Sequence, residues 1–401
     1  MSFEYIDYEL SNAITDIAAG PFGSNLKVSC FTATGFPIID GANLKEITVT
    51  DNITKFVPED KARSLHRSIA KRRDVVVTIS GNVGQVSYIP DDSQYAEYLC
   101  SQRQFRVTFD ESKIYVPYLV YYFHSVEGKS KILAFANQTG VPALSQPLKN
   151  FRKIKINLPS LAEQKKIAAI LSALDEKIAI NRAINDNLYA QAKAIFTERF
   201  INIETLPDGW QKGNLLDIAN YLNGLAMQKF RPHDDEVGLP VLKIKELRQG
   251  SCDASSELCS PSIKPEYIVH DGDVIFSWSG SLLVDIWCGG TCGLNQHLFK
   301  VTSETYDKWF YYLWTAHHLE RFIAIAADKA TTMGHIKRGE LTRAEVLIPS
   351  DENYKEISSL MNPLFNLIVA NRIEARKLTE LRDELLPKLM SGEINVSTVQ
   401  I

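Results

Sequence analysis

The sequence predicts an α+β protein in which two similar mixed α/β domains alternate with two long helices. Three observations lead to this fold class. The chain has 401 residues, which is more than one ordinary domain needs. One set of sequence patterns occurs twice along nearly its whole length. After each copy comes a stretch of about forty residues with the apolar periodicity of a helix.

The composition is that of a globular protein rather than a membrane protein or a disordered chain. Hydrophobic residues make up 45% of the chain and charged residues 23%, both close to globular averages. No apolar run reaches bilayer length, and residues 1–12 lack the basic and apolar segments of a secretion signal. We therefore expect a cytoplasmic protein without membrane contact. The net charge of −4 counts only weakly against nucleic-acid binding, which depends on the local face.

The repeat is visible in short matching segments. Asp74–Gly81 recurs as Asp273–Gly280, and Gly35–Ile39 recurs as Gly238–Leu242. The apolar residues of these segments predict strands that end in turns. We also match Asp16-Ile17-Ala18 with Asp217-Ile218-Ala219, and Leu119–Tyr122 with Phe310–Leu313 in short aromatic amphipathic helices near 117–125 and 308–317.

Each globular part is followed by a predicted long helix. Residues 161–200 contain no Pro or Gly, and Ser160 with Glu163 has the spacing of a capping box. The second helix is expected over residues 351–390, capped by Ser350 and ended by Gly392, with a kink or a late start at Pro363. Apolar stripes with one constant offset mark both helices. The stripe residues are Ile167, Leu171, Leu174, Ile178, Asn181 and Leu188 in the first helix, and Ile357, Met361, Leu364, Ile368, Asn371 and Leu378 in the second.

A long helix with a single apolar stripe needs a partner. It either lies along its own globular part or packs on the other helix, and we favour an antiparallel coiled coil. Asn181 and Asn371 lie at matching positions in the stripes. A buried Asn can fix the register of a coiled coil, or these side chains have no special role; both interpretations stay open. The predicted segments are 1–158, 159–202, 203–348, 349–395 and a tail of 396–401.

The sequence predicts no metal site and no catalytic site. The cysteine pairs 252/259 and 288/292 lack the spacing of zinc knuckles, so we interpret all six cysteines as reduced structural thiols. Phosphate-binding, zinc-protease and serine-hydrolase motifs are absent from the sequence. Asn362-Pro363-Leu364-Phe365 lacks the second proline of the adenine-methyltransferase motif, and it falls in the stripe of the second helix.

Three segments carry a family resemblance. The stretch LPSLAEQKKIAAILSALDEKIAINRAINDNLYAQAKAIF, residues 158–196, resembles the central conserved region of type I restriction–modification specificity subunits. LRDELLPKLMSGEI, residues 381–394, resembles their distal conserved region, and LPDGWQKGNLLDIA, residues 206–219, resembles the start of their second target-recognition domain. The resemblance covers the whole chain in the order that this family has.

The resemblance implies a division of labour. Each globular part would be a target-recognition domain that reads one half of a split double-stranded DNA site. The helices would separate the half-sites and dock two methyltransferase subunits, and restriction subunits would complete the nuclease. S-adenosylmethionine, ATP and Mg would be used by those partners, and this chain would bind no cofactor. A coiled-coil scaffold without catalysis, or the specificity subunit of a related methyltransferase-only or defence complex, remains an alternative.

Candidate DNA contacts are of two kinds. Cations neutralise phosphates and give affinity without sequence information, whereas Asn, Gln and Arg read base edges. A single cation cluster is more often a solvated face, but clusters in both halves keep the binding interpretation open. The cationic candidates are Lys71, Arg72, Arg73, Lys243, Lys245, His335, Lys337 and Arg338. The polar and base-reading candidates are Ser80, Asn82, Thr139 and Thr332 in loops, and Gln102, Arg103, Asn295 and Gln296 in matching strands.

Overall fold

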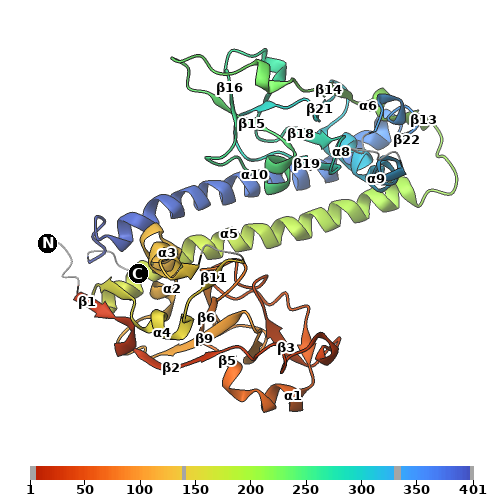
Figure 1. Ribbon diagram of the computed structural model, residues 1–401. Coiled ribbons are helices and arrows are strands. Elements are labelled where there is room, and N and C mark those ends of the chain that lie inside the picture. Colours follow the sequence, from red (N-terminus) through yellow and green to blue (C-terminus); the bar gives the residue numbers. More distant parts are fainter. Residues whose placement is uncertain (1–5, 138–140, 329–335, 398–401) are drawn as a thin grey trace. The chain divides into compact units, whose positions relative to one another are not determined.

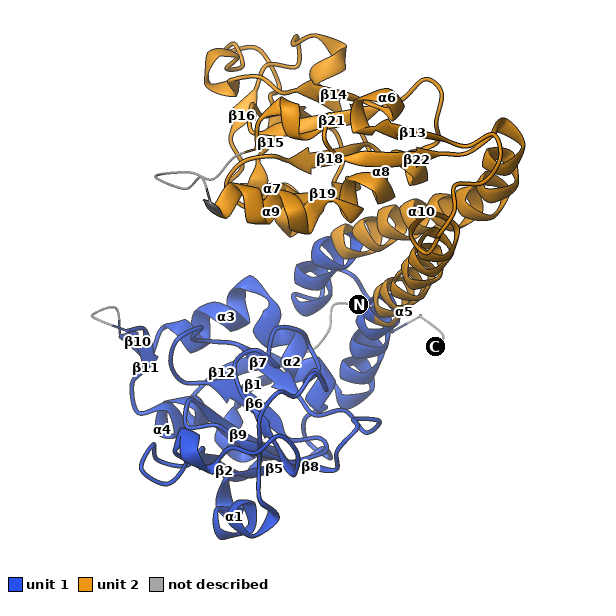
Figure 2. Cartoon of the chain, turned by 90° about the vertical axis from the view of Figure 1, so that its right-hand side faces the viewer, with its two compact units in different colours: residues 1–175, 381–401 blue, residues 176–380 orange. Residues whose placement is uncertain are grey.

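The computed structural model describes residues 6–137, 141–328 and 336–397. The chain forms two compact units, which Figure 2 shows in two colours. Unit 1 comprises Met1–Asp175 and Leu381–Ile401, and unit 2 comprises Glu176–Glu380. Each unit therefore contains one globular part and one segment of each long helix. Strands and helices alternate in both units (Figure 1), which confirms the mixed α and β fold class.

The described part of unit 1 contains two four-stranded sheets and two strand pairs. The first sheet has the order β2 (Ile14–Ala19), β9 (Gln104–Phe109), β6 (Val75–Thr78), β7 (Val86–Tyr88). The second has the order β4 (Phe56–Val57), β3 (Phe36–Ile39), β8 (Glu97–Cys100), β5 (Ile69–Lys71). The pairs are β1 (Ile6–Glu9) with β12 (Lys155–Leu158), and β10 (Ala136–Asn137) with β11 (Ala143–Leu144).

Unit 2 repeats the larger part of this topology. Its first sheet has the order β14 (Asn220–Asn223), β21 (Leu298–Thr302), β18 (Val274–Ser277), β19 (Leu283–Ile286). Its second has the order β16 (Leu258–Cys259), β15 (Leu239–Leu242), β20 (Cys292–Leu294), β17 (Ile268–Val269). The pair β13 (Gln211–Asn214) with β22 (Glu345–Ile348) corresponds to β1 with β12.

Strand registers confirm most of the predicted repeat. In the parallel pair β3–β8, Ile39 lies opposite Cys100, and in β15–β20, Leu242 lies opposite Leu294. These registers reproduce the match between residues 35–39 and 238–242. Likewise, residue 75 pairs with residue 107 in unit 1, as 274 pairs with 301 in unit 2. The two units therefore share one fold residue by residue in their central strands.

The predicted match of Asp16-Ile17-Ala18 with Asp217-Ile218-Ala219 is wrong. Gly20 donates its backbone N–H to Gln104 at 2.8 Å, and Gly224 donates to the equivalent Leu298 at 3.0 Å. Gly20 therefore corresponds to Gly224, and Asp16 corresponds to Asn220. Asp217 instead lies in the one-turn helix α6 (Leu215–Ile218), where its carboxylate completes a capping box. The shared Asp-Ile-Ala tripeptide comes from two different local structures.

Two of the shorter helices lie within the core rather than at its surface. Helix α2 (Val116–His124) is buried at every residue from Val116 to Phe123, and α8 (Lys308–His317) is buried from Trp309 to Thr315. The prediction of amphipathic helices is therefore wrong in pattern although it is right in position. Side chains of α2 pack in one core with those of the first sheet and the first long helix, so no face of α2 meets water. The remaining short helices are α1 (Glu59–Ser64), α3 (Val126–Leu133), α4 (Pro147–Arg152), α7 (Ile244–Gln249) and α9 (Leu319–Asp328).

The two long helices α5 (Leu161–Phe196) and α10 (Asp351–Met390) form where the sequence predicts them. The Ser160 backbone N–H donates to Glu163 Oε2 at 3.0 Å, which confirms the capping box. Gly392 has a φ of 75° after α10, which confirms the predicted stop. The late start at Pro363 is wrong, because α10 is continuous through that residue and packs on its globular part from its second turn onward. Helix α5 ends a turn earlier than predicted, in the π-helical turn Thr197–Ile201.

Contacts within each unit show that α5 and α10 run antiparallel. In unit 2, Asn181 donates to Glu374 at 2.7 Å, and Asn371 donates to Asn185 at 3.0 Å. In unit 1, Arg382 donates to Asp175 at 2.6 Å. Residue numbers on α10 fall as those on α5 rise. This confirms the antiparallel pair, and Asn181 and Asn371 are buried polar contacts within it.

The apolar stripes serve both of the packing modes that the sequence left open. Ile167 and Leu171 are fully buried in the core of the unit 1 globular part, and Ile357 and Met361 are buried in that of unit 2. The stripe residues that face the other helix lie further along each chain. Of the predicted set, the fully or nearly fully buried residues are Ile167, Leu171, Ile178, Asn181, Ile357, Met361, Ile368 and Asn371, and the half-buried ones are Leu174, Leu188, Leu364 and Leu378.

We expect Arg382→Ala to destabilise unit 1 by about 1–3 kcal/mol. Arg382 bonds Asp175 at 2.6 Å, and the same carboxylate accepts a hydrogen bond from the buried Tyr121 hydroxyl at 2.6 Å. Removing the guanidinium leaves this partly buried carboxylate with one partner fewer. Denaturant unfolding measures the change. Lys388→Ala, which removes an exposed ion pair with Glu384 on the same helix, is the matched control and should change stability little.

Candidate nucleic-acid interface

In each unit, three loop segments meet at the edge of the first sheet where its central strands end. In unit 1, Ile79 donates its N–H to Arg103 O at 2.7 Å, and Leu144 donates to Ile79 O at 2.8 Å. In unit 2, Trp278 donates its N–H to His297 O at 3.4 Å, and Ile336 donates its N–H to Trp278 O at 3.1 Å. The segment after Gly20 or Gly224 closes the same edge. Loops that a rigid sheet positions in this way are common binding surfaces.

The structure brings four of the predicted residues of unit 1 together. Ser80, Asn82, Gln102 and Arg103 line one open hollow of about 530 Å³. Asn82, Gln102 and Arg103 are exposed and Ser80 is half-buried. Gly81 has a φ of 87°, which lets the turn between Ser80 and Asn82 reverse the chain. These side chains present an amide, a guanidinium and a hydroxyl group on one surface.

The strand assignment of the base-reading candidates is wrong. Gln102 and Arg103 lie in the turn between β8 and β9, and Asn295 and Gln296 lie in the turn between β20 and β21. The strand registers make Gln296 of unit 2 equivalent to Gln102 of unit 1, and His297 equivalent to Arg103. The sequence alignment was therefore shifted by one residue and missed His297. A turn rather than a strand leaves these side chains free to face a ligand.

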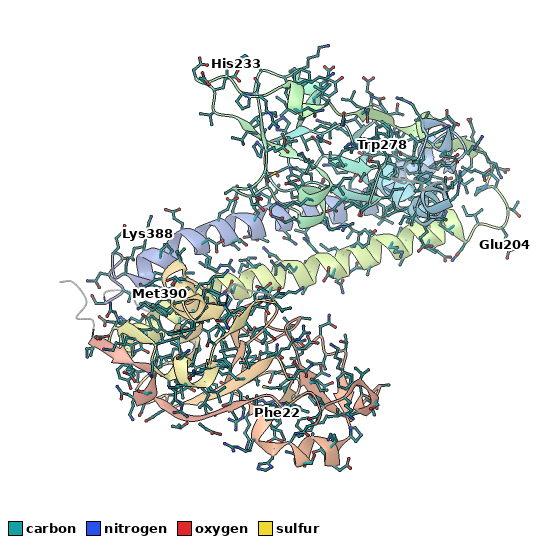
Figure 3. All side chains as sticks on the ribbon, in the orientation of Figure 1. Phe22, Glu204, His233, Trp278, Lys388 and Met390 are labelled. Atoms are coloured by element: carbon teal, nitrogen blue, oxygen red, sulfur yellow. The ribbon has the colours of Figure 1, made fainter. Side chains whose placement is uncertain are left out.

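The unit 2 turn is more closely packed than its unit 1 counterpart. Asn295 is only 6% exposed, and its Oδ1 accepts the His297 backbone N–H at 3.3 Å. Its side chain therefore shapes the turn in this structure. Gln296 and His297 are half-buried, and the His297 ring lies 3.1 Å from the Ser279 hydroxyl. Trp278, labelled in Figure 3, donates its indole N–H to Asn223 at 3.0 Å.

One exposed aromatic side chain near the unit 1 hollow was missed by the sequence analysis. Phe22 is 82% exposed (Figure 3) in the segment after Gly20. Gly23 lies directly against the Gln102 side chain, whose Oε1 is 2.6 Å from the position a Cβ would take. An exposed ring beside polar side chains is the pattern of nucleic-acid surfaces, where aromatic groups stack on bases. Its only signal in the sequence is its place in the loop Gly20-Pro21-Phe22-Gly23.

The cations of residues 71–73 are arranged apart from the hollow. Arg73 bonds Glu111 at 2.8 and 2.5 Å, and its guanidinium stacks on the Tyr88 and Tyr115 rings. The hydrogen bonds that Arg73 donates to Glu111 raise the pKa of Arg73, although burial opposes this shift. Arg73 is therefore committed to an internal ion pair. Lys71 and Arg72 are exposed; Lys71 lies 3.7 Å from Glu97, and Arg72 donates to Ser93 O at 3.0 Å.

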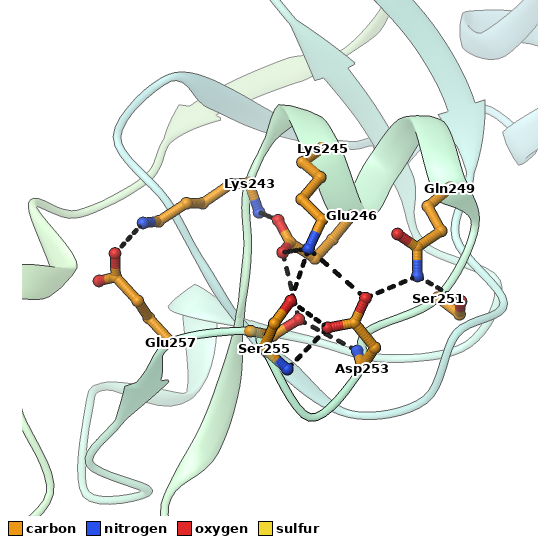
Figure 4. Close-up of polar contacts among 9 residues, drawn as sticks. Lys243, Lys245, Glu246, Gln249, Ser251, Asp253, Ser255 and Glu257 are labelled. Carbon is orange, nitrogen blue, oxygen red and sulfur yellow. Dashed lines mark hydrogen bonds and ion pairs between the residues drawn. The ribbon is translucent and has the colours of Figure 1, made fainter. Parts of the chain in front are cut away.

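Lys243 and Lys245 of unit 2 also have acidic partners. Lys243 bonds Glu257 at 2.5 Å, and Lys245 lies 3.4 Å from Asp253 and 2.8 Å from the Ser255 hydroxyl (Figure 4). The hydrogen bond from Lys243 lowers the pKa of Glu257. These pairs neutralise the local charge, so neither lysine offers phosphate an uncompensated cation.

Two of the remaining candidates follow Ile336 in the third loop segment of unit 2. Lys337 and Arg338 are exposed, and Arg338 borders a shallow hollow of about 360 Å³ with Asp217 and Glu304. Thr139, Thr332 and His335 lie outside the described residues. The structure thus gathers one polar cluster in unit 1 and distributes the unit 2 candidates more widely.

The described residues contain neither a metal-ligand cluster nor a membrane-spanning helix. No cluster of three or more His, Cys, Asp or Glu side chains with metal-binding geometry occurs within 6–137, 141–328 and 336–397. No helix in these ranges combines the length and apolarity needed to cross a bilayer. Cys252 is half-buried beside the buried Cys292, and the hydrogen bond between the two thiols, followed by burial, raises the pKa of the Cys292 thiol.

Comparison with known proteins gives concordant matches. The model of the type I restriction modification DNA specificity domain matches residues 35–190 and again residues 207–382. The specificity subunit of the type I restriction enzyme MjaIX from Methanocaldococcus jannaschii is 25% identical over 323 residues, 74% of this chain and 73% of that protein. The specificity subunit of EcoKI from Escherichia coli K12 is 25% identical over 396 residues, 89% of this chain and 82% of the relative.

A solved structure shares the fold. The crystal structure of the type I restriction–modification S subunit from M. genitalium superposes with a TM-score of 0.59 over 96% of both chains, at 15% sequence identity. The two family-model matches fall one on each copy of the repeat. The first match begins at β3 and extends into α5, and the second begins just before β13 and extends into α10.

Proposed function

Because the chain belongs to the type I restriction–modification DNA specificity family, we propose that it reads a two-part DNA site for partner subunits that carry the chemistry. The observation that carries this proposal is the repeated edge at which three loop segments meet in each unit. Two equivalent surfaces on one chain suit two half-sites. In unit 1 that edge presents Asn82, Gln102 and Arg103, the side-chain types that pair with base edges.

Exposed cations would supply the part of the DNA affinity that does not depend on sequence. Lys337 and Arg338 in unit 2, and Lys71 and Arg72 in unit 1, are exposed. They would contact phosphates and make binding salt-dependent. Gln296 and His297 in unit 2 would take the places of Gln102 and Arg103. Two units with different side chains at equivalent positions would read two different half-sites.

Docking of methyltransferase subunits is assigned to the outer faces of the long helices. Ile180 and Ile184 of α5 are 53% and 40% exposed, and Leu360 and Leu367 of α10 are 48% and 45% exposed. Exposed aliphatic side chains one or two turns apart on a helix form an apolar face that suits a partner. Two methyltransferase subunits, and restriction subunits beyond them, would supply S-adenosylmethionine, ATP and Mg-dependent steps. This chain would act without a cofactor or catalytic residue of its own.

Exchange of unit 1 should change one half of the recognised site. The exchanged part is residues 1–175 with 381–401, taken from another family member, because both helix segments pack in the unit 1 core. Methylome mapping in a host with the partner genes gives the modified motif. We expect a new first half and an unchanged second half. A change in both halves would contradict independent reading, and a motif that is wholly unchanged would contradict DNA reading by unit 1.

A narrower exchange provides the control. Replacing residues 1–158 alone would place a foreign globular part against the native Ile167, Leu171, Leu389 and Met390, all buried in its core. We expect lower stability than in the full exchange, with the same new half-site where the protein folds. A scaffold without DNA recognition would yield no defined motif in either exchange.

A further inference from the structure

The floor of the unit 1 hollow is a row of polar side chains across three neighbouring strands. Thr78 of β6 lies opposite Gln104 of β9, and its N–H donates to Gln85 O, one residue before β7. Thr78 and Gln104 are each 1% exposed. The Thr78 hydroxyl donates to Gln85 Oε1 at 3.2 Å, and the Ser101 hydroxyl donates to Gln104 Oε1.

Gly41 leaves space above this row. A Cβ at residue 41 would lie 3.2 Å from Gln85 Oε1 and 3.8 Å from Gln104 Nε2. The φ of Gly41 is not in the left-handed region, so its backbone does not require glycine. The missing side chain therefore matters for space. A side chain at this position would enter the hollow beside both amides.

Unit 2 fills the equivalent space with apolar side chains. The same strand registers put Leu298 in the place of Gln104, Ser277 in that of Thr78 and Leu283 in that of Gln85. Ile244 follows Leu242 as Gly41 follows Ile39. Leu298 is fully buried, and Ile244 and Leu283 pack in one cluster with it. The fold thus does not need a hollow here, and unit 1 has one where unit 2 carries larger apolar residues at three of these four positions.

Buried amide groups cost free energy unless they form hydrogen bonds, so amides where unit 2 has leucines suit a ligand that forms hydrogen bonds. The floor offers amide donors and acceptors, and the walls include the apolar Leu26, Phe31 and Ile38. A flat ring with hydrogen-bonding groups on its edge fits this combination. The volume of about 530 Å³ lies in the usual range of ligand sites. The mouth carries Gln102 and Arg103, so the ligand would come from the proposed DNA surface.

We propose that this hollow is a nucleobase pocket in which unit 1 holds one base of its half-site outside the helical stack. The inference rests on the proposed function and deepens it. Gln104 and Gln85 bind the edge of the extruded base, and Phe31 and Leu26 contact its faces. Proteins that extrude bases read them by edge hydrogen bonds and stacking in this manner. Unit 2, whose equivalent space is filled, reads its half-site without extrusion.

The test uses 2-aminopurine, whose fluorescence rises when it leaves the stack. Duplexes that the complete methyltransferase complex prefers are first selected from a randomised library, and 2-aminopurine is then placed at each position in turn. The variants carry the unit 2 residues: Gln85→Leu with Gln104→Leu, and separately Gly41→Ile. A milder variant, Gly41→Ala, places one methyl group against both amides and keeps the test available where a larger side chain fails to fold.

We expect one position of the unit 1 half-site to become several-fold brighter in the wild-type complex, and this signal to be lost in every variant. A mismatch at that position should strengthen wild-type binding roughly tenfold, because an unpaired base is extruded at lower cost, and should not strengthen variant binding. Signals from bases that the methyltransferases extrude should persist. Lys129→Ala, which changes an exposed residue of α3 that does not line the hollow, should keep the bright position.

Three results would overturn the pocket. One is a complex that prefers its selected duplex but shows no variant-sensitive bright position in the unit 1 half-site; in that case DNA reading stands and extrusion fails. Another is a bright position that survives Gln85→Leu with Gln104→Leu and Gly41→Ala. The third is variant-sensitive binding of free deoxynucleoside monophosphates without any unstacked DNA base. Failure to select any preferred duplex would instead contradict the proposed function.

Discussion

Leu171→Asp should unfold unit 1 while unit 2 stays folded. Leu171 is fully buried in α5, where it packs in one core with residues of the first sheet and α2. An unpaired carboxylate in this core costs roughly 4 kcal/mol or more. That is a large share of the total stability of a domain, which is about 5–15 kcal/mol. We expect the largest loss of stability among single changes in α5 at this residue and at Ile167.

The distribution of tryptophan makes the result easy to localise. All five tryptophans of the chain lie between residues 210 and 314, within unit 2. Leu171→Asp should therefore reduce the far-ultraviolet circular dichroism signal strongly but leave the native tryptophan emission nearly unchanged. Loss of both signals in one transition would show that the two units do not unfold separately. Wild-type stability of the variant would contradict the burial of Leu171.

Ile180→Asp is the matched control on the same helix. Ile180 is 53% exposed, so an aspartate there remains hydrated and should change stability little. If this face docks a methyltransferase subunit, the same variant should weaken assembly of the complex. The two variants thus separate folding from docking: Leu171→Asp loses unit 1 in the isolated chain, and Ile180→Asp loses only the partner. Normal assembly of Ile180→Asp would contradict docking on this part of α5.

The repeat and the long helices could be predicted because they depend on local patterns. Residues 75–79 are a continuous run of β-branched residues, which is typical of a strand buried on both faces, and α5 has a capping box and an uninterrupted stripe. The Asp16 match failed because a tripeptide has too little information to distinguish a strand from a capped helical turn. The effect of Pro363 on the helix was overestimated, because packing of α10 on the unit 2 core outweighs one missing backbone hydrogen bond.

The candidate site was predictable only in part. Ser80, Asn82, Gln102 and Arg103 were found because they follow matching strands, and the fold gathers turns at one edge. Whether a cation is free cannot be inferred from its neighbours in sequence. Arg73 pairs with Glu111, which is 38 residues away. The unit 1 hollow exists because the fold places Gly41 beside Gln85 and Gln104. The sequence shows these residues but not that they lie together.

Matched insertions in both long helices should lengthen the neutral gap between the two half-sites by about 3 bp. Duplicating residues 178–184 in α5 and 371–377 in α10 adds seven residues to each helix, about 10 Å at 1.5 Å per residue, or roughly three base pairs at 3.4 Å each. Because the inserted layers face each other, the contact of Asn181 with Glu374 is reproduced in the new layer. A heptad shifts the apolar stripe by only about 20°, so the pairing should persist.

Insertion in one helix alone is the control for this prediction. Seven extra residues in α5 only would move Asn185 away from Asn371 and leave buried amides without partners, so we expect lower stability and little methylation. The methylated motif in cells measures the gap. With both insertions, the bases read in each half should stay the same and only their separation should grow. Retained methylation with an unchanged gap would show that the helix pair does not set the spacing, and altered bases would show that the helices also shape the reading loops.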